Sequence, residues 1–157
     1  TISLFSRIVV VDRDSMMNTL HHQEQITTPN LFYTPEKGDI LVMNCYGLNE
    51  TIIKRCIGVQ GDKIRIDYNN NILEVNGEVM SNEYLGEPMY DKPSFDKTFV
   101  VEDGVYEYKV PVGKIFVMGD NRNHSSDSRS GLVGFVDERT ILGKVLIRLK
   151  PFTVYTD

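Results

Sequence analysis

The 157-residue sequence lacks the features of several common classes of protein. It has only two cysteines, Cys45 and Cys56, which are too few for a disulfide scaffold and lie in apolar stretches typical of small buried residues. No run reaches the roughly 20 apolar residues that span a bilayer, because Arg7 interrupts the N-terminal TISLFSRIVVV. The net charge of −5 argues against nucleic acid as a partner, since a phosphate-binding surface needs clustered lysine and arginine.

Histidine is also scarce. The three histidines, His21, His22 and His124, have no partner at metal-ligand spacing, and the cysteines form no CxxC motif. We therefore expect no metal and no cofactor, and we interpret the histidines as surface residues.

Short runs rich in valine and isoleucine, separated by glycine, asparagine and aspartate, fill most of the chain and predict a mostly β protein. The clearest runs are DILVMNCYG (39–47), TIIKRCIGV (51–59), DKIRIDY (62–68), NILEVNGEVM (71–80), KIFVMG (114–119) and ILGKVLIRL (141–149). Asn76-Gly77 predicts a tight hairpin, because both residues tolerate positive φ. Only residues 15–20 and 137–140 favour a helical turn.

The composition changes between about residues 80 and 110, where the chain becomes polar, aromatic and rich in proline and glycine. This stretch indicates an insertion of hairpins and loops on an apolar core. We therefore predict an antiparallel β core from residues 1–66 and 111–150, a smaller inserted β region at 67–110, and a C-terminal tail at 151–157.

Two residues stand out as candidates for chemistry. Ser15 follows the apolar run Ile8–Val11 within VDRDSMMNTL, although most loop serines cap or turn the chain. In the run 51–59, strand alternation puts Lys54 on one face with Ile52 and Cys56. Burial of that face would lower the pKa of Lys54 and suit it to act as a general base; the alternative is a lysine that faces solvent.

A third candidate is the loop GDNRNHSSDSRSG, residues 119–131, which follows an apolar strand. It holds many hydrogen-bond donors and acceptors, and Asp127 and Arg129 are spaced to form an ion pair. Such a density favours a built polar network, whereas the alternative is a solvated surface loop.

Taken in order, these segments resemble type I signal peptidases, the Ser-Lys serine proteases that remove signal peptides. The nucleophile motif of that family reads Ser-Gly-Ser-Met-x-Pro-Thr-Leu, and its lysine motif reads Lys-Arg-Val-Ile-Gly-Leu-Pro-Gly-Asp. The matching segments are 15–20, 38–42, 54–62, 117–122, 125–129 and 134–136. The resemblance extends from about Ile8 to Leu149, and the segment from Val117 to Arg129 is its most specific part.

The resemblance implies a fold, an activity and a set of roles. It implies the family's antiparallel β core, with Ser15 as nucleophile and Lys54 as its base, so that no histidine is required. Ser125 is similar to the serine that orients the lysine. The remaining supporting residues are Asp127 and Arg129 as a structural pair, with Gly119, Asp120, Asn121 and Arg122 as the loop beneath the site.

Two residues before the nucleophile depart from the family pattern. Arg13 stands where the family has Ser or Gly, and Asp14 stands where it has Gly. In many members the hydroxyl of the serine at the position of Arg13 helps to bind the oxyanion. Losing one such donor typically costs about 2.7–4 kcal/mol of barrier. A carboxylate at Asp14 would repel the oxyanion, or pair with Lys54 and hold it protonated. Asn18 and Gln60 replace prolines of the family motifs.

Several functions follow as hypotheses. The leading one is a signal peptidase that cleaves secreted preproteins at the extracytoplasmic face of the cell membrane. We expect this chain to be the soluble domain of such an enzyme, with an N-terminal membrane anchor upstream. The alternative is a catalytically impaired, signal-peptidase-like assembly factor for surface pili, with pilin subunits as partners. A self-cleaving repressor with a Ser-Lys dyad fits less well, because the sequence has no helical DNA-binding region.

The same resemblance gives expectations about substrate and membrane contact. The substrate would lie extended against an edge strand near Val9 and Val11, with Met16 beside it. Phe5, Met16 and Met17 would be exposed apolar side chains close to the site, and we expect them to meet the membrane surface.

Overall fold

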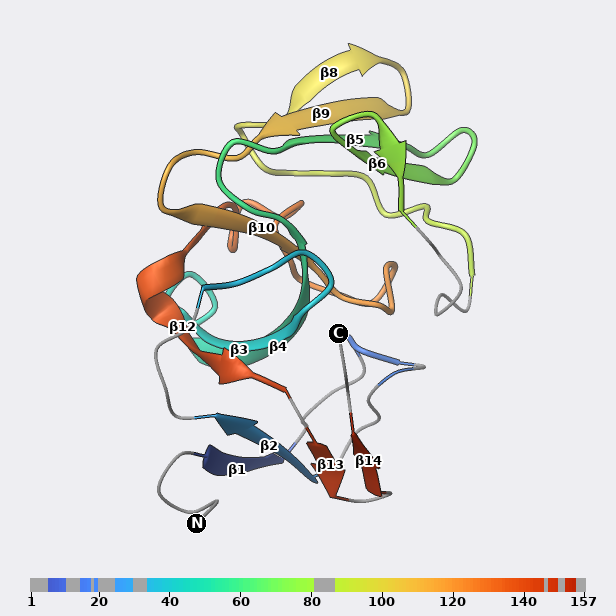
Figure 1. The fold of residues 1–157 in the computed structure, drawn as a ribbon. Helices are drawn as coiled ribbons and strands as arrows, with labels where there is room; N and C mark the ends of the chain where they lie inside the picture. The colour runs from blue at the N-terminus through green and yellow to red at the C-terminus, as the bar shows by residue number, and fades with distance from the viewer. Residues whose placement is uncertain are drawn as a thin grey trace.

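The computed structural model describes residues 6–10, 15–17, 19, 25–29, 34–80, 87–145, 147–149 and 152–154. These residues form three antiparallel sheets and one short 3-10 helix, so the predicted mostly β, antiparallel fold is confirmed. The sheets lie one above another in Figure 1, with the central sheet between the other two. None of the helices among these residues is long and apolar enough to cross a membrane.

The central sheet has the strand order β11-β10-β4-β3-β12. Its strands are β3 (Ile40–Cys45), β4 (Glu50–Gly58), β10 (Lys114–Met118), β11 (Val136–Asp137) and β12 (Ile141–Lys144), with the 3-10 helix η1 (Glu138–Thr140) between the last two. Both faces of β3 and β10 are buried almost throughout, which explains their continuous apolar runs.

The inserted sheet has the order β7-β6-β5-β9-β8. Its strands are β5 (Lys63–Asp67), β6 (Ile72–Val75), β7 (Glu78–Val79), β8 (Phe99–Glu102) and β9 (Val105–Lys109). The hairpin predicted at Asn76-Gly77 is confirmed: the two residues have φ of 54° and 83° and join β6 to β7. One face of this sheet packs on the central sheet, where Ile64, Ile66 and Tyr108 share a buried cluster with Phe116 and Met118.

The inserted sheet begins earlier than the sequence indicates. β5 starts at Lys63 and pairs with β6 and β9, whereas we expected residues up to 66 to belong to the core. The crossing lies in the turn before β5, where Gly61 N–H donates to Val110 O at 2.8 Å and Val110 N–H donates to Asp62 O at 2.9 Å. Since the alternating pattern of β5 suits a half-buried strand of either sheet, it could not locate this crossing. The division into domains stays a prediction.

A third sheet has the order β1-β2-β13-β14, with β1 (Ser6–Val10), β2 (Gln25–Pro29), β13 (Ile147–Leu149) and β14 (Phe152–Val154). The expected tail at 151–157 therefore contains a strand, because β14 pairs with β13. The apolar run 141–149 also divides into β12 and β13, which belong to different sheets. Among the described strands β1 pairs only with β2, so it stands at an edge as expected for the strand near Val9.

Candidate active site

The Ser15 turn is held in place by its neighbour Met16. Met16 is 1% exposed and packs with Ile40, Val42 and Val145 on the central sheet. The prediction that Met16 is an exposed apolar residue is therefore wrong, while its place beside the substrate stays a prediction. Its side chain contributes instead to the core that anchors the turn, while Ser15 itself stays half-buried.

The loop after β10 binds this turn through backbone and side-chain contacts. Asn121 N–H donates to the carbonyl oxygen of Ser15 at 2.8 Å, and Asp120 N–H approaches Met16 Sδ at 3.5 Å. The hydroxyl of Thr19 donates to Asp120 Oδ2 at 2.5 Å. Two segments about 100 residues apart in the sequence are thus joined at one place.

Arg55 also binds the Asp120 carboxylate. Its Nε and Nη2 donate to the two oxygens of Asp120, each at 2.8 Å, and the Asp120 side chain is fully buried. A bidentate guanidinium–carboxylate pair combines charge with fixed geometry. Sequence reasoning placed Arg55 on the face of β4 opposite Lys54 but gave it no role. The sequence held one signal of this pair: Arg55 is a cation on a strand predicted to be largely apolar, and Asp120 is an acid to which sequence reasoning had assigned no partner.

Lys54 lies on β4 directly opposite Leu41 of β3. It is 4% exposed, and its strand neighbours on the same face, Ile52 and Cys56, are buried as well. The predicted burial of this face is confirmed. Burial lowers the pKa of Lys54 from 10.5 to about 8, because the apolar surroundings disfavour the ammonium more strongly than the nearby Asp127 carboxylate stabilises it.

Asp127 and Arg129 form the predicted ion pair. Arg129 Nε and Nη2 donate to the Asp127 carboxylate, each at 2.9 Å, and both residues are almost fully buried. Gly119 N–H donates to Asp127 Oδ2 at 3.0 Å, and Arg129 Nη2 also donates to Arg122 O at 2.5 Å. Burial opposes the charge on Asp127, but Arg129 and Gly119 outweigh it and lower the pKa of the carboxyl group. Asp127 therefore presents a fixed negative charge near Lys54.

Gly119 and Ser125 define the tightest contact of the site. A Cβ added at Gly119 would lie 2.3 Å from Ser125 Oγ and 2.5 Å from the Ser15 carbonyl oxygen. Glycine is therefore required for the turn, the loop and Ser125 to approach one another. The Ser125 hydroxyl is buried and has no hydrogen-bond partner within the described part of the chain. An unsatisfied buried hydroxyl is uncommon and points to a functional position.

Asn123 links this loop to the inserted region and was not singled out by sequence reasoning. Its Nδ2 donates to Glu87 Oε1 at 3.0 Å and to Pro88 O at 2.8 Å, and its Oδ1 accepts from the N–H of Tyr90 at 2.7 Å and of Asp91 at 3.2 Å. An asparagine in a polar loop gives no signal of such a role, since its partners are mostly backbone groups about 35 residues away.

The structure thus places the loop that holds most of the predicted site residues beside both the Ser15 turn and Lys54. Residues 119–129 contact the Ser15 turn, while Asp127 places its charge near Lys54. Val11, Arg13, Asp14 and Phe5 lie outside the described residues, and Val9 is located only as a backbone position in β1. No group of three or more histidine, cysteine, aspartate or glutamate side chains in the described ranges is arranged to hold a metal ion.

Comparison with known proteins gives a consistent result. The family model for signal peptidases, peptidase S26, matches residues 1–150. A signal peptidase I from Bacillus amyloliquefaciens is 38% identical over 146 residues, which cover 91% of this chain and 75% of that protein. Signal peptidase IB from Staphylococcus aureus is 36% identical over 151 residues, or 90% of this chain and 76% of that protein.

A solved structure agrees with the sequence relatives. The crystal structure of a signal peptidase I from Enterococcus faecalis matches with a TM-score of 0.56 and 28% identity, and the match covers 73% of this chain and 98% of that one. The chain therefore belongs to the signal peptidase family, peptidase S26, and is a serine endopeptidase of the signal peptidase I type.

Proposed function

We propose that Ser15 and Lys54 form the Ser-Lys dyad of this peptidase and that it cleaves signal peptides from secreted preproteins. The observation that carries the proposal is the burial of Lys54, with its pKa near 8. At pH 7 roughly one tenth of such lysines would be neutral, against fewer than about one in a thousand for an ordinary lysine. A neutral amine is what a general base requires.

The proposed reaction needs only these two side chains at the reacting centre. Ser15 Oγ attacks the scissile carbonyl carbon while its proton moves to Lys54 Nζ. When the tetrahedral intermediate collapses, the Lys54 ammonium gives that proton to the leaving amine, and an acyl ester remains on Ser15. Lys54 then takes a proton from a water molecule, whose oxygen attacks the ester carbon. When this second intermediate collapses, the bond to Ser15 Oγ breaks, Lys54 returns the proton to Ser15 Oγ, and the new carboxylate leaves.

Ser125 is proposed to orient the lysine. Its buried hydroxyl has no partner in the described residues and lies against Gly119, the residue whose backbone also meets the Ser15 turn. A hydrogen bond from a Lys54 N–H to the oxygen of this hydroxyl would fix the amine and leave its lone pair free to accept the Ser15 proton. Asp127 would then stabilise the ammonium formed during proton transfer, because its own carboxylate is held ionised by Arg129.

The substrate is proposed to add to the free edge of β1 near Val9 and Val11. Edge strands bind extended peptides through main-chain hydrogen bonds, and β1 has a partner strand on one side only among the described strands. Family membership supports a position at the extracytoplasmic face of the cell membrane, with contact to the membrane surface. Sedimentation of the chain with phospholipid vesicles tests that contact, and equal sedimentation without vesicles would count against it.

We expect slow catalysis because of Arg13 and Asp14, which replace the residues that typically precede the nucleophile. The test is cleavage of a synthetic signal-peptide substrate by the unmodified chain, by Ser15→Ala and by Arg13→Ser/Asp14→Gly. Ser15→Ala should abolish cleavage, and the double variant should accelerate it about a hundredfold if it regains one oxyanion donor. Cleavage that survives Ser15→Ala would overturn the assignment of the nucleophile.

A second candidate role rests on the same two residues. Arg13 and Asp14 also fit a signal-peptidase-like assembly factor that binds pilin subunits without cleaving them. Absence of cleavage even in Arg13→Ser/Asp14→Gly, together with an intact fold, would favour that role over the peptidase.

A further inference from the structure

β8 is an edge strand with an apolar surface. It ends the strand order of the inserted sheet, and no strand borders its outer side within the described residues. Its side chains Phe99, Val100 and Val101 are 65%, 59% and 39% exposed. In Figure 1 the strand lies at the end of the molecule farthest from β1 and β2. An exposed apolar edge is a template for pairing with another strand, and natural proteins usually protect it.

The charges around β8 are complementary under a two-fold rotation. Lys97 precedes the strand next to Asp96, while Glu102 ends it and Asp103 follows, and all four side chains are exposed. If two copies of the strand pair antiparallel, each Lys97 comes opposite the two acids of the other copy. A parallel arrangement would instead place like charges together. The sequence around β8 is therefore self-complementary in one orientation.

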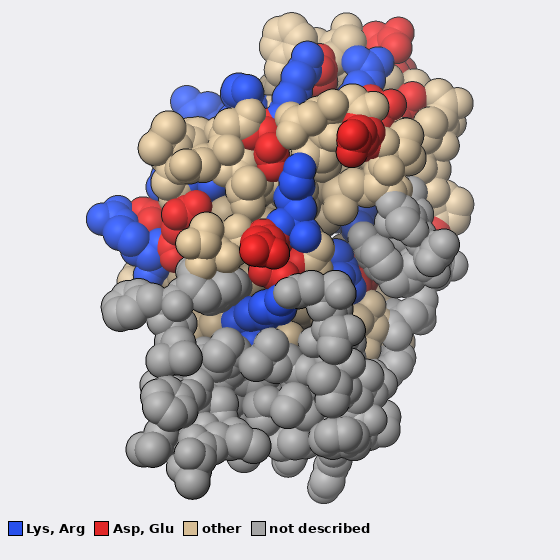
Figure 2. All heavy atoms as spheres, in the orientation of Figure 1, with Lys and Arg blue, Asp and Glu red and all other residues tan. Residues whose placement is uncertain are grey.

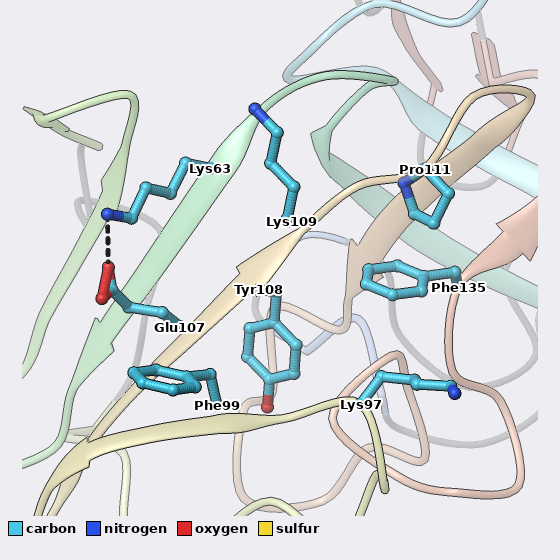
Figure 3. A pocket seen from close by; sticks show the side chains of 8 residues that line it. All are labelled: Lys63, Lys97, Phe99, Glu107, Tyr108, Lys109, Pro111 and Phe135. Atoms are coloured by element: carbon cyan, nitrogen blue, oxygen red, sulfur yellow. Dashed lines mark ion pairs between the residues drawn. The ribbon is translucent and has the colours of Figure 1, made fainter.

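A pocket of about 580 Å³ lies at the Lys97 end of the strand, and its lysines add positive charge to that end. Its lining includes Lys63, Lys97, Lys109, Phe99, Tyr108 and Phe135, with Glu107 as its one carboxylate (Figure 3). Lys63 pairs with Glu107 at 3.0 Å, so the pocket keeps a surplus of positive charge although the whole chain carries −5. Figure 2 shows lysine and arginine side chains interspersed with aspartate and glutamate over the same upper part of the molecule.

Contacts within the chain bear on how strongly two copies could associate through β8. Lys109 Nζ already donates to Gly61 O at 2.6 Å, and Lys92 lies 3.8 Å from Asp103 of its own chain. Asp103 is 99% exposed, so this internal pair contributes little and leaves the carboxylate accessible. Since only four residues form the strand, the paired edge buries a small area, and we expect weak association that salt suppresses.

We propose that β8 pairs with β8 of a second copy of this chain, antiparallel, to form a two-fold dimer in which Lys97 of each copy meets Glu102 and Asp103 of the other. The apolar residues Phe99 to Val101 would then be covered by their counterparts. The proposal concerns the inserted sheet alone and is independent of the dyad.

The test is sedimentation velocity of the unmodified chain at low and high ionic strength, at concentrations from roughly 10 µM to 1 mM. A dimer is expected at low ionic strength and should dissociate as salt is added. Lys97→Glu and Glu102→Lys/Asp103→Lys should each weaken dimerisation by at least about tenfold, because every dimer then contains two repulsive contacts in place of two attractive ones.

The decisive step is to mix the two variants. Lys97→Glu and Glu102→Lys/Asp103→Lys restore attraction at both contacts when they meet each other, so the mixture should form a heterodimer, and the variant with all three substitutions should associate with itself. Arg139→Glu is the matched control, since it makes the same charge change at an 89% exposed side chain on η1 and should dimerise as the unmodified chain does. Circular dichroism confirms that each variant is folded.

Three results would each overturn the proposal. The unmodified chain could remain monomeric at low ionic strength over the whole concentration range. Lys97→Glu and Glu102→Lys/Asp103→Lys, each alone in solution, could dimerise as strongly as the unmodified chain. The mixture could stay monomeric although both variants are folded.

Discussion

The region around Lys54 and the region around β8 place their side chains in opposite ways. Near Lys54, charged groups are buried and bound: Asp127 and Arg129 are both less than 5% exposed and pair with each other. Along β8, large apolar groups are exposed. Buried charge and exposed apolar surface are the two informative departures from ordinary protein composition. The first departure marks the proposed dyad, and the second marks the proposed interface between copies.

The largest effect is expected where a buried charge loses its partner. Arg129→Met leaves the Asp127 carboxylate buried without compensation, and we expect a loss of about 3–5 kcal/mol in the free energy of unfolding. The Arg139–Asp137 pair is the control, because its arginine is exposed although it binds its carboxylate in the same bidentate way. Arg139→Met should leave the urea midpoint nearly unchanged. Equal losses from both substitutions would contradict the distinction between the two pairs.

Lys54→Met should change how stability depends on pH. The folded-state pKa of Lys54, about 8, is below its ordinary value of 10.5, so the unfolded chain binds the proton more tightly. The unmodified chain therefore gains stability relative to Lys54→Met as the pH rises from 8 to 10.5, by about 3 kcal/mol in total. Urea unfolding of both proteins at pH 7, 9 and 10.5 measures this gain. A constant difference across these pH values would show that Lys54 is not shifted.

Gly119→Ala should disturb the contact between the turn and the loop. The added methyl group meets Ser125 Oγ and the Ser15 carbonyl well inside van der Waals distance, and such overpacking typically costs about 1–3 kcal/mol. Peptide cleavage should fall as well, because Ser15 and Ser125 are both displaced. The control is Gly131→Ala, whose Cβ would meet only Ser94 O at 3.5 Å. If Gly119→Ala behaves like the control, the close approach is not required.

The smallest effect is expected on β8 itself. Val100→Thr replaces a 59% exposed valine and should change the free energy of unfolding by less than about 0.5 kcal/mol. The same substitution at Val75, which is 5% exposed in the same sheet, should cost about 1–3 kcal/mol because it buries a hydroxyl group. Thermal unfolding of the two variants compares them directly, and a large loss at Val100 would mean that β8 is covered within the monomer.

The comparison also explains which features the sequence could predict. Strand alternation located the buried face of Lys54, and the spacing of Asp127 and Arg129 predicted their pair, since both signals are local. Asn76-Gly77 predicted its hairpin for the same reason. Met16 was placed wrongly because a methionine in a polar turn gives no sign of the apolar cluster it joins, formed by Ile40, Val42 and Val145.

Contacts between segments far apart in the sequence could not be predicted from local sequence patterns. β5 alternates as a strand of either sheet would, so only its pairing with β9 assigns it to the inserted sheet. The pairing of β14 with β13 joins the chain end to a strand that composition does not distinguish from its neighbours. The role of Arg55 depends on Asp120, which lies 65 residues further along the chain.

The most direct test of the proposed dyad is the pH dependence of kcat/KM for a signal-peptide substrate, which reports the pKa values of the free enzyme. With Lys54 as the base, kcat/KM should rise about tenfold per pH unit below pH 8 and level off above it. In Arg13→Ser/Asp14→Gly the plateau should be higher. A profile that is flat between pH 6 and pH 9, or one that keeps rising toward pH 10.5, would contradict the assignment of a buried Lys54 as the general base.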